Sequence, residues 1–167
     1  MILVTCGTHE QGFDRLVKKV DELAGEGVIS DVIIQTGYTE YEPQHCKWQK
    51  FFPYQEMQRL AKKADIIISH GGPSSFVMAL QNGKIPIVVP RRPEFGEHVN
   101  DHQVIFCHAV QERNGNIIVV DNVDILKMIL QRYDQIVSVM PVGIRSNNDK
   151  FCEDFEHLVK KVTGEEK

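Results

Sequence analysis

DIIISHGGPSSFVMALQNGKIPIVVP, residues 65–90, is the most informative part of the sequence. It begins with a continuous β-branched run, Ile66–Ile68, which is typical of a strand buried on both faces. Two glycines interrupt the run, and Pro73 then suits the first position of a helix because its φ is fixed and it has no N–H. The helix is expected to end at Gly83, and Ile85–Pro90 predicts a second buried strand. This order predicts a β–turn–α–β unit with a right-handed crossover.

The turn before this helix has the composition of an anion-binding site. Gly71 and Gly72 let a ligand approach the backbone closely, and the helix start offers free N–H groups and the hydroxyls of Ser74 and Ser75. His70 stands at the carboxyl end of the strand, where open α/β sheets bind their ligands. The pattern is neither a Walker A loop nor a GxGxxG fingerprint. We interpret it as a diphosphate site; the alternative is an ordinary βα turn with capping serines.

The rest of the sequence alternates short apolar runs with segments of helical periodicity. Further strands are expected at residues 2–6, 31–36 and 117–120, with a short edge strand at 50–52; helices are expected at 13–24, 54–64, 101–111, 123–130 and 148–162, and a loop at 38–48. This alternation predicts an α/β fold: a single Rossmann-like open, mostly parallel sheet flanked by helices. No repeat or linker divides the chain, so residues 1–167 are expected to form one domain.

The composition is that of a soluble globular protein. Of the 167 residues, 42% are hydrophobic and 25% are charged, and the net charge is −4. The negative charge argues against a nucleic-acid partner, because phosphates require a basic surface. No apolar run approaches the roughly 20 residues that cross a bilayer, and the sequence has no signal-peptide start. The cysteines are dispersed without a CxxC pair, so we expect reduced thiols and a cytoplasmic protein.

Other polar patterns suggest weaker hypotheses. Glu97, His98 and His102 could form part of a metal site, because histidines four apart share a helical face, but no third ligand has a dependable spacing. A serine hydrolase is disfavoured because the serine pair lacks a GxSxG elbow. Arg91 directly follows a strand, so it is a candidate contact for a bound phosphate, with a solvated charge as the alternative. No metal is expected.

Parallel strands that end near Gly7, Ser69 and Pro90 should emerge at one edge of the sheet. The residues expected to reach a common pocket there are Gly7, Thr8, His70, Ser74, Ser75, Arg91 and residues 100–103. Amide and imidazole groups suit sugar hydroxyls, because each can both donate and accept hydrogen bonds. The sequence therefore predicts a nucleotide-sugar site.

These residues also carry a family resemblance. The segments SHGGPSSFVMALQNGKIPIVVPRR and FGEHVNDHQ together resemble the donor-binding, C-terminal half of GT-B glycosyltransferases of family 28. From its ILVTCGTHEQGFDRLVKKVD opening to about residue 110, the chain looks like the stand-alone catalytic subunits of bacterial capsule and exopolysaccharide synthesis. Those subunits are similar to the catalytic subunit of the two-part dolichol-pathway N-acetylglucosaminyltransferase. The resemblance implies the donor-binding half of a GT-B fold.

The resemblance also implies roles for individual residues. The UDP diphosphate would be held by His70, Gly71, Gly72, Ser74 and Ser75, and the donor hexose would lie at Asn100, His102 and Gln103. Many relatives carry a glutamate that binds the ribose at the position of Met78. A methionine cannot accept those hydrogen bonds, so the ribose contact of this chain departs from the family pattern.

A GT-B enzyme needs two Rossmann-like halves, and the resemblance implies that a membrane-anchored partner brings the acceptor-binding half. The implied reaction is an inverting transfer of a hexose from a UDP-sugar to an undecaprenyl-diphosphate-linked sugar. Galactose is favoured, with glucuronic acid and N-acetylglucosamine open. The helix start would stabilise the leaving UDP without a metal cofactor, the general base would lie on the partner, and the partner would recruit the chain from the cytoplasm to the inner membrane face.

Two alternatives to this enzyme remain. One is a non-catalytic regulatory subunit that binds a UDP-sugar within a polysaccharide assembly complex. The other is a single-chain hydrolase of nucleotide sugars. Transfer by a reconstituted pair would favour the enzyme, and release of free sugar by this chain alone would favour the hydrolase.

Overall fold

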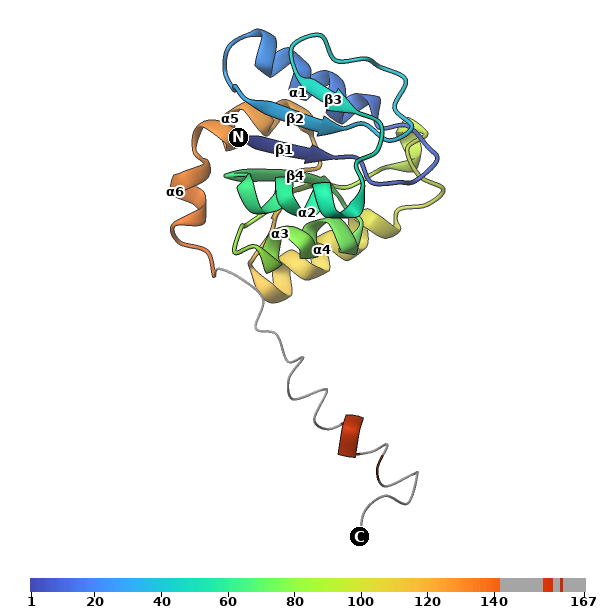
Figure 1. Ribbon diagram of the computed structural model, residues 1–167, viewed down its shortest axis with the longest axis vertical. Helices are drawn as coiled ribbons and strands as arrows, with labels where there is room; N and C mark the ends of the chain where they lie inside the picture. The colour runs from blue at the N-terminus through green and yellow to red at the C-terminus, as the bar shows by residue number, and fades with distance from the viewer. Residues whose placement is uncertain (142–154, 158–159, 161–167) are drawn as a thin grey trace.

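A single six-stranded sheet forms the centre of the protein in the computed structural model, which describes residues 1–141, 155–157 and 160 (Figure 1). The strands are β1 (Ile2–Thr5), β2 (Val32–Gln35), β3 (Lys47–Gln49), β4 (Ile66–His70), β5 (Ile87–Val89) and β6 (Ile118–Val119). Their order is β3-β2-β1-β4-β5-β6, and each neighbouring pair is parallel. The predicted open parallel sheet is confirmed, and the order reverses between β1 and β4, where such sheets bind ligands.

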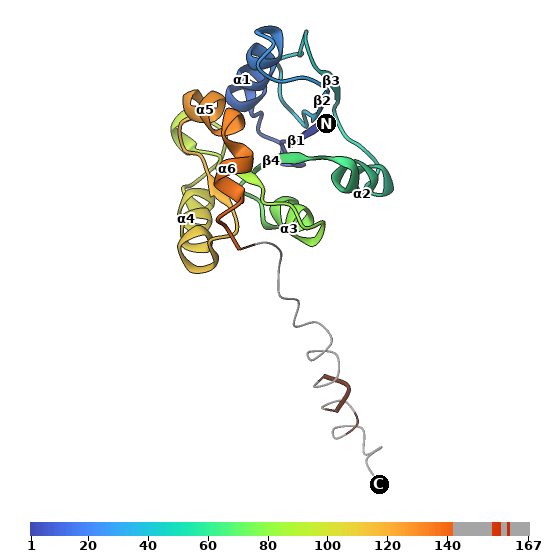
Figure 2. The same cartoon turned by 90° about the vertical axis from the view of Figure 1, so that its left-hand side faces the viewer.

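Helices cover both faces of this sheet (Figure 2). They are α1 (Asp14–Gly25), α2 (Tyr54–Lys63), α3 (Pro73–Gln81), α4 (His102–Asn114), α5 (Leu126–Gln131) and α6 (Tyr133–Val137), with short 3-10 turns η1 (Pro93–Phe95) and η2 (Val123–Ile125). Successive strand residues point to opposite faces, so Val4 packs with α1 while Leu3 packs with α2 and α3. Strands covered on both sides need the continuous apolar runs that the sequence has.

Some predicted boundaries need correction. The edge strand is β3 at Lys47–Gln49 and not residues 50–52, because pairing with β2 through residues 33–35 places it there. Part of the segment expected to be a loop, 38–48, is therefore strand. Helix α6 had no predicted counterpart. The expected helix at 148–162 falls mostly outside the described residues, of which 155–157 and 160 are helical.

The irregular segment between β2 and β3 is held by a buried carboxylate on α1. Asp21 accepts hydrogen bonds from the backbone N–H groups of Gln44 and His45 and from the Tyr41 hydroxyl, at 2.8–2.9 Å. Burial alone would raise the pKa of Asp21, but these donors hold it below its usual value. Three donors on one carboxylate fix the path of the chain that leads into β3.

Within the described ranges, no helix has both the length and the apolar character that a membrane crossing requires.

Candidate functional site

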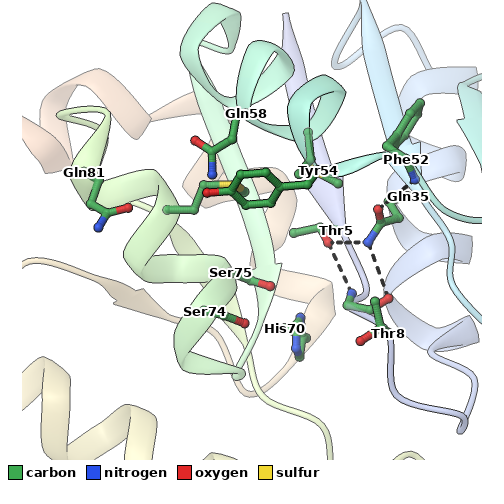
Figure 3. A pocket seen from close by; sticks show the side chains of 13 residues that line it. Thr5, Thr8, Gln35, Phe52, Tyr54, Gln58, His70, Ser74, Ser75 and Gln81 are labelled. Atoms are coloured by element: carbon green, nitrogen blue, oxygen red, sulfur yellow. Dashed lines mark hydrogen bonds between the residues drawn. The ribbon is translucent and has the colours of Figure 1, made fainter.

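The carboxyl ends of β1, β2 and β4 surround a pocket of about 490 Å³ that lies against α2 and α3 (Figure 3). The lining residues are Thr5, Gly7, Thr8, Gln35, Phe52, Tyr54, Met57, Gln58, His70, Ser74, Ser75, Met78 and Gln81. Five of the predicted site residues, Gly7, Thr8, His70, Ser74 and Ser75, are thus brought together at one place. None of the described residues that line this pocket is an Asp, Glu, Lys or Arg.

The His70 imidazole fills the space between two glycine-containing turns and is only 7% exposed. A Cβ added at Gly7 would lie 2.6 Å from His70 Nε2, and one added at Gly72 would lie 2.9 Å from His70 Cδ2 and closer still to Nε2. Any side chain at either position would therefore displace the ring. Gly7 also has a φ of +74°, which other residues rarely adopt.

The same burial keeps His70 uncharged. Desolvation, reinforced by the positive charge of Arg91, lowers the pKa of His70 to about 4. The backbone of Thr5 favours the charged form, but Nδ1 has no partner in hydrogen-bond geometry among the described residues. At pH 7 the ring is a neutral imidazole that can donate one hydrogen bond and accept another.

Helix α3 begins directly after His70 and presents an uncapped N-terminus to the pocket. Gly72 precedes the helix without a side-chain cap, and Pro73 occupies its first turn. Ser74 is exposed and Ser75 is half-buried, and neither hydroxyl has a hydrogen-bond partner within the described part of the chain. Free N–H groups, two hydroxyls and the positive end of the helix dipole converge here, which is the arrangement that binds phosphate groups.

Gln103 lies behind this turn and supports it. Its Oε1 accepts hydrogen bonds from the backbone N–H groups of Gly71 and Arg91, both at 3.1 Å, and the side chain is buried. A Cβ at Gly71 would lie 2.8 Å from Cys107 Sγ and 2.9 Å from Gln103 Cβ, so α4 also packs tightly against the turn. The amide oxygen of Gln103 therefore fixes the position of the β4–α3 turn relative to the end of β5.

Two other residues predicted to contact the sugar, Asn100 and His102, lie at the exposed start of α4. Asn100 Oδ1 accepts a hydrogen bond from the backbone N–H of His102 at 3.1 Å, and the His102 ring stacks on Phe106. Asn100, His102 and Gln103 are not among the residues that line the pocket. The structure thus places the predicted phosphate and sugar groups on neighbouring helices, with the sugar group outside the pocket itself.

Arg91 does not face the pocket, contrary to its sequence-based interpretation as a phosphate contact or a solvated charge. The side chain is 1% exposed and lies over the Phe13 ring. Its Nη atoms donate to the carbonyls of Cys6, Gln11, Gly12 and Glu97 at 2.7–3.1 Å. A guanidinium has enough donors for several acceptors, so Arg91 ties the loop after β1 to the loop after β5.

The structure contradicts the assumption behind the metal hypothesis, that His98 and His102 lie on one face of a helix. Helix α4 begins at His102, so His98 lies outside it and the two histidines do not share a helical face. Glu97 is buried and makes a bidentate ion pair with Arg15, with both N–O distances at 2.9 Å. Within the described residues, no group of three or more His, Cys, Asp or Glu side chains could hold a metal ion.

The sequence did not predict that the carboxyl end of β2 and the helix α2 form one wall of the pocket. Gln35 lies deep in the pocket, donates to Thr5 Oγ1 at 3.2 Å and accepts from the Phe52 N–H at 3.1 Å. Tyr54 is 77% exposed although it lines the pocket. Tyr54 lies three residues before Met57 and seven before Ala61, on the side of α2 that packs against the core, and this spacing was its signal in the sequence. Met78, noted for its departure from relatives, also lines the pocket.

Comparison with known proteins gives one family match. A model of the glycosyltransferase family 28 C-terminal domain matches residues 1–134. No curated protein sequence matches the chain.

Comparison with solved structures finds similar glycosyltransferases. The glycotransferase of kitacinnamycin has a TM-score of 0.53 at 17% identity, over 78% of this chain and 33% of that one. SnogD, a glycosyltransferase from Streptomyces nogalater, has a TM-score of 0.47 at 21% identity, over 84% of this chain and 39% of that one. The chain thus spans between a third and two fifths of the length of these structures, and the first likeness supports the fold alone.

Proposed function

The chain belongs to the glycosyltransferase family 28 C-terminal domain family, and on this premise we propose that it binds a UDP-sugar donor as the catalytic subunit of a two-subunit, inverting glycosyltransferase. The observation that carries the proposal is the uncapped α3 N-terminus, with the free hydroxyls of Ser74 and Ser75 beside the neutral imidazole of His70. These groups converge on one end of a pocket at the switch point of a parallel sheet, where nucleotides bind in such folds.

The electrostatics of the pocket suit a diphosphate that leaves during the reaction. In an inverting transfer, an acceptor hydroxyl oxygen attacks the anomeric carbon and the bond to the β-phosphate oxygen breaks. Negative charge then grows on UDP, next to the α3 N–H groups and the serine hydroxyls. Donors fixed before the reaction stabilise such charge without reorganising. The acceptor proton passes to a general base, which we assign to the partner.

Exposed aromatic side chains near the edge of the sheet that holds the pocket support the proposal of a partner subunit. Tyr38 is 53% exposed and Phe51 is 37% exposed, and their rings meet edge to face at 5.4 Å. Trp48 on β3 is 36% exposed. Aromatic residues at a surface are enriched in protein interfaces. We propose that they contact a membrane-anchored, acceptor-binding subunit, which recruits this chain to the inner face of the membrane.

The proposed acceptor is an undecaprenyl-diphosphate-linked sugar of capsule or exopolysaccharide synthesis, and galactose is the favoured donor hexose. The test is transfer of radiolabelled sugar to lipid-linked acceptor from UDP-galactose, UDP-glucuronic acid and UDP-N-acetylglucosamine. The chain is assayed alone and after co-expression with a candidate membrane subunit. We expect transfer only with the partner present, and with UDP-galactose as the best donor.

Each other outcome has a defined meaning. Full transfer by the isolated chain would contradict the two-subunit proposal. Release of free sugar from the donor by the isolated chain would indicate a hydrolase. UDP binding without transfer by any pair would indicate the non-catalytic regulatory subunit.

A further inference from the structure

A second, shallower pocket of about 330 Å³ adjoins the pocket at the start of α3, which we call the donor pocket. The second pocket is lined by Thr8, His9, Glu10 and Tyr38. Thr8 lines the donor pocket as well, so the two pockets meet there. In Figure 3, Thr8 and Ser74 lie on opposite sides of His70. The second pocket therefore opens beside the expected diphosphate site, on the side away from α3.

The two loops that form the second pocket are fixed from within the protein. Arg91 donates to the carbonyls of Cys6 and Gln11, at 2.7 and 2.8 Å, so it holds the loop after β1 on both sides of residues 8–10. The loop after β2 packs closely against it, because a Cβ at Gly37 would lie 2.9 Å from the carbonyl oxygen of Gly7. A pocket with fixed walls loses little conformational freedom when a ligand binds.

His9 offers this pocket a hydrogen-bond donor. Its Nδ1 accepts a hydrogen bond from the backbone N–H of Gln11 at 3.2 Å. Burial, followed by the positive charge of Arg91 and the neighbouring His98 ring, lowers the pKa of His9, so the imidazole is neutral at pH 7. Because Nδ1 is the acceptor, the proton of the neutral ring lies on Nε2. His9 is therefore a donor at Nε2, which agrees with a general base on the partner.

The other side chains of this pocket suit an uncharged sugar. Glu10 is exposed, and neither its carboxylate nor the Thr8 hydroxyl has a hydrogen-bond partner among the residues that the structure describes. A carboxylate accepts hydrogen bonds from neighbouring hydroxyls but repels a second anion. The Tyr38 ring is 53% exposed and presents apolar surface. This combination matches the C–H and O–H groups of a neutral hexose better than it matches a phosphate.

We infer that the second pocket binds the acceptor sugar: Glu10 accepts hydrogen bonds from its hydroxyls, Tyr38 packs against its ring, and Thr8 lies between it and the donor. The inference rests on the proposed function, and it adds that this chain shares the recognition of the acceptor with its partner. Tyr38 also belongs to the aromatic surface proposed to contact the partner, so an acceptor carried by the partner would enter from this side.

The place of the pocket in the sheet favours the acceptor over the donor hexose. The residues expected to hold the donor hexose begin α4, which follows β5. The second pocket instead follows β1 and β2, and β4 separates these strands from β5 in the sheet. The donor diphosphate at the start of α3, after β4, would thus lie between the two sugars.

The chemistry of the pocket predicts an affinity and a preference. A single hexose in an open pocket should bind with a Kd of about 1–10 mM. Methyl glucuronide should bind about fivefold more weakly than methyl glucoside, because its carboxylate approaches Glu10. Glu10→Gln should weaken glucoside binding about threefold to tenfold and remove this preference. Tyr38→Ala should weaken binding about 2- to 12-fold, whereas Tyr38→Phe keeps the ring and should retain it.

The experiment is an amide NMR titration of the full chain saturated with UDP. The probes are methyl glycosides of glucose, galactose and N-acetylglucosamine, with methyl glucuronide as the anionic counterpart, each up to about 100 mM. The matched control is Glu40→Gln, an exposed glutamate close to Tyr38 that does not line the pocket, and it should change nothing. A repeat with UDP-galactose in place of UDP shows whether the donor sugar fills this pocket. Glu10 and Tyr38 are both exposed, so the variants should fold, and circular dichroism checks that they do.

The outcomes distinguish the inference from the function on which it rests. Shifts at residues 8–10 and 38 with a neutral glycoside, and loss of the neutral preference in Glu10→Gln, would support the acceptor site. The inference would be overturned, with UDP binding intact, if no neutral glycoside shifted these residues, if the glucuronide bound equally well, or if neither Glu10→Gln nor Tyr38→Ala weakened binding. Glycoside binding that UDP-galactose abolishes would assign the pocket to the donor hexose and also overturn it. Absence of UDP binding by the unmodified chain would overturn both the inference and the proposed function.

Discussion

Replacing Gly72 with alanine tests how His70 is packed into the site. Gly72 has a φ of −78° and a ψ of 127°, which alanine adopts without strain, so the substitution acts only through its new methyl group. That methyl would overlap the His70 imidazole, which is 7% exposed and has little room to move. Overpacking of this kind costs about 1–3 kcal/mol, which corresponds to a loss of roughly 2–12 °C in Tm for a chain of this size.

A double-mutant cycle isolates the contact. Urea unfolding is measured for the unmodified chain, Gly72→Ala, His70→Ala and the double variant. The clash disappears when the ring is absent, so Gly72→Ala should cost less than about 0.5 kcal/mol in the His70→Ala background. Gly27→Ala, at a φ of +71° with open space around it, measures the opposite case, in which backbone strain acts without a steric clash. An equal cost of Gly72→Ala in both backgrounds would refute this account of the turn.

Three further predictions concern charge and hydrogen bonding around the site. The pKa of His70 is about 4 in the folded protein and about 6.5 in the unfolded chain, so the unfolded chain binds more protons between these pH values. The neutral ring therefore contributes about 3 kcal/mol to the free energy of unfolding above about pH 6.5, and this contribution is lost as the pH falls toward 4. His70→Asn should remove this part of the pH dependence of urea unfolding, and an unchanged slope would contradict a neutral buried ring. Gln103→Leu leaves two buried N–H groups without an acceptor and should cost about 2–4 kcal/mol, whereas Glu112→Ala on the exposed side of α4 should cost almost nothing. Glu97→Gln weakens a buried ion pair and should cost about 3–5 kcal/mol in the same assay; a loss below about 1 kcal/mol would show that Arg15 needs no charged partner.

The sheet could be predicted from the sequence because its signals are local. Continuous β-branched runs such as Ile66–Ile68 predict strands covered on both faces, and the structure has them there. Strand β3 was misplaced because Lys47–Gln49 is exposed and has no apolar period. Its position depends on pairing with β2 and on the distant carboxylate of Asp21, and neither contact is visible in the local sequence.

The candidate site was predictable where the backbone demands particular residues. Glycines, proline and serines at the start of α3 mark a helix N-terminus, and that turn lines the pocket. The sequence does not predict whether a long polar side chain points into the pocket or into the protein interior. Arg91 and Gln103 follow strands and loops as ligand contacts would, but tertiary packing turns them inward to hold backbone groups. The place of Tyr54 in the pocket was missed because Tyr54 lies near α3 only once α2 and α3 pack in the folded protein.

Calorimetric titration of UDP tests the central claim most directly. The unmodified chain is compared with the Ser74→Ala, Ser75→Ala double variant, and Ser30→Ala, an exposed serine just before β2, is the control. Each lost hydrogen bond to a charged group is worth about 1.5–3 kcal/mol, so the double variant should bind UDP at least about 100-fold more weakly. Equal UDP affinity in the double variant and the unmodified chain would contradict a diphosphate site at the start of α3.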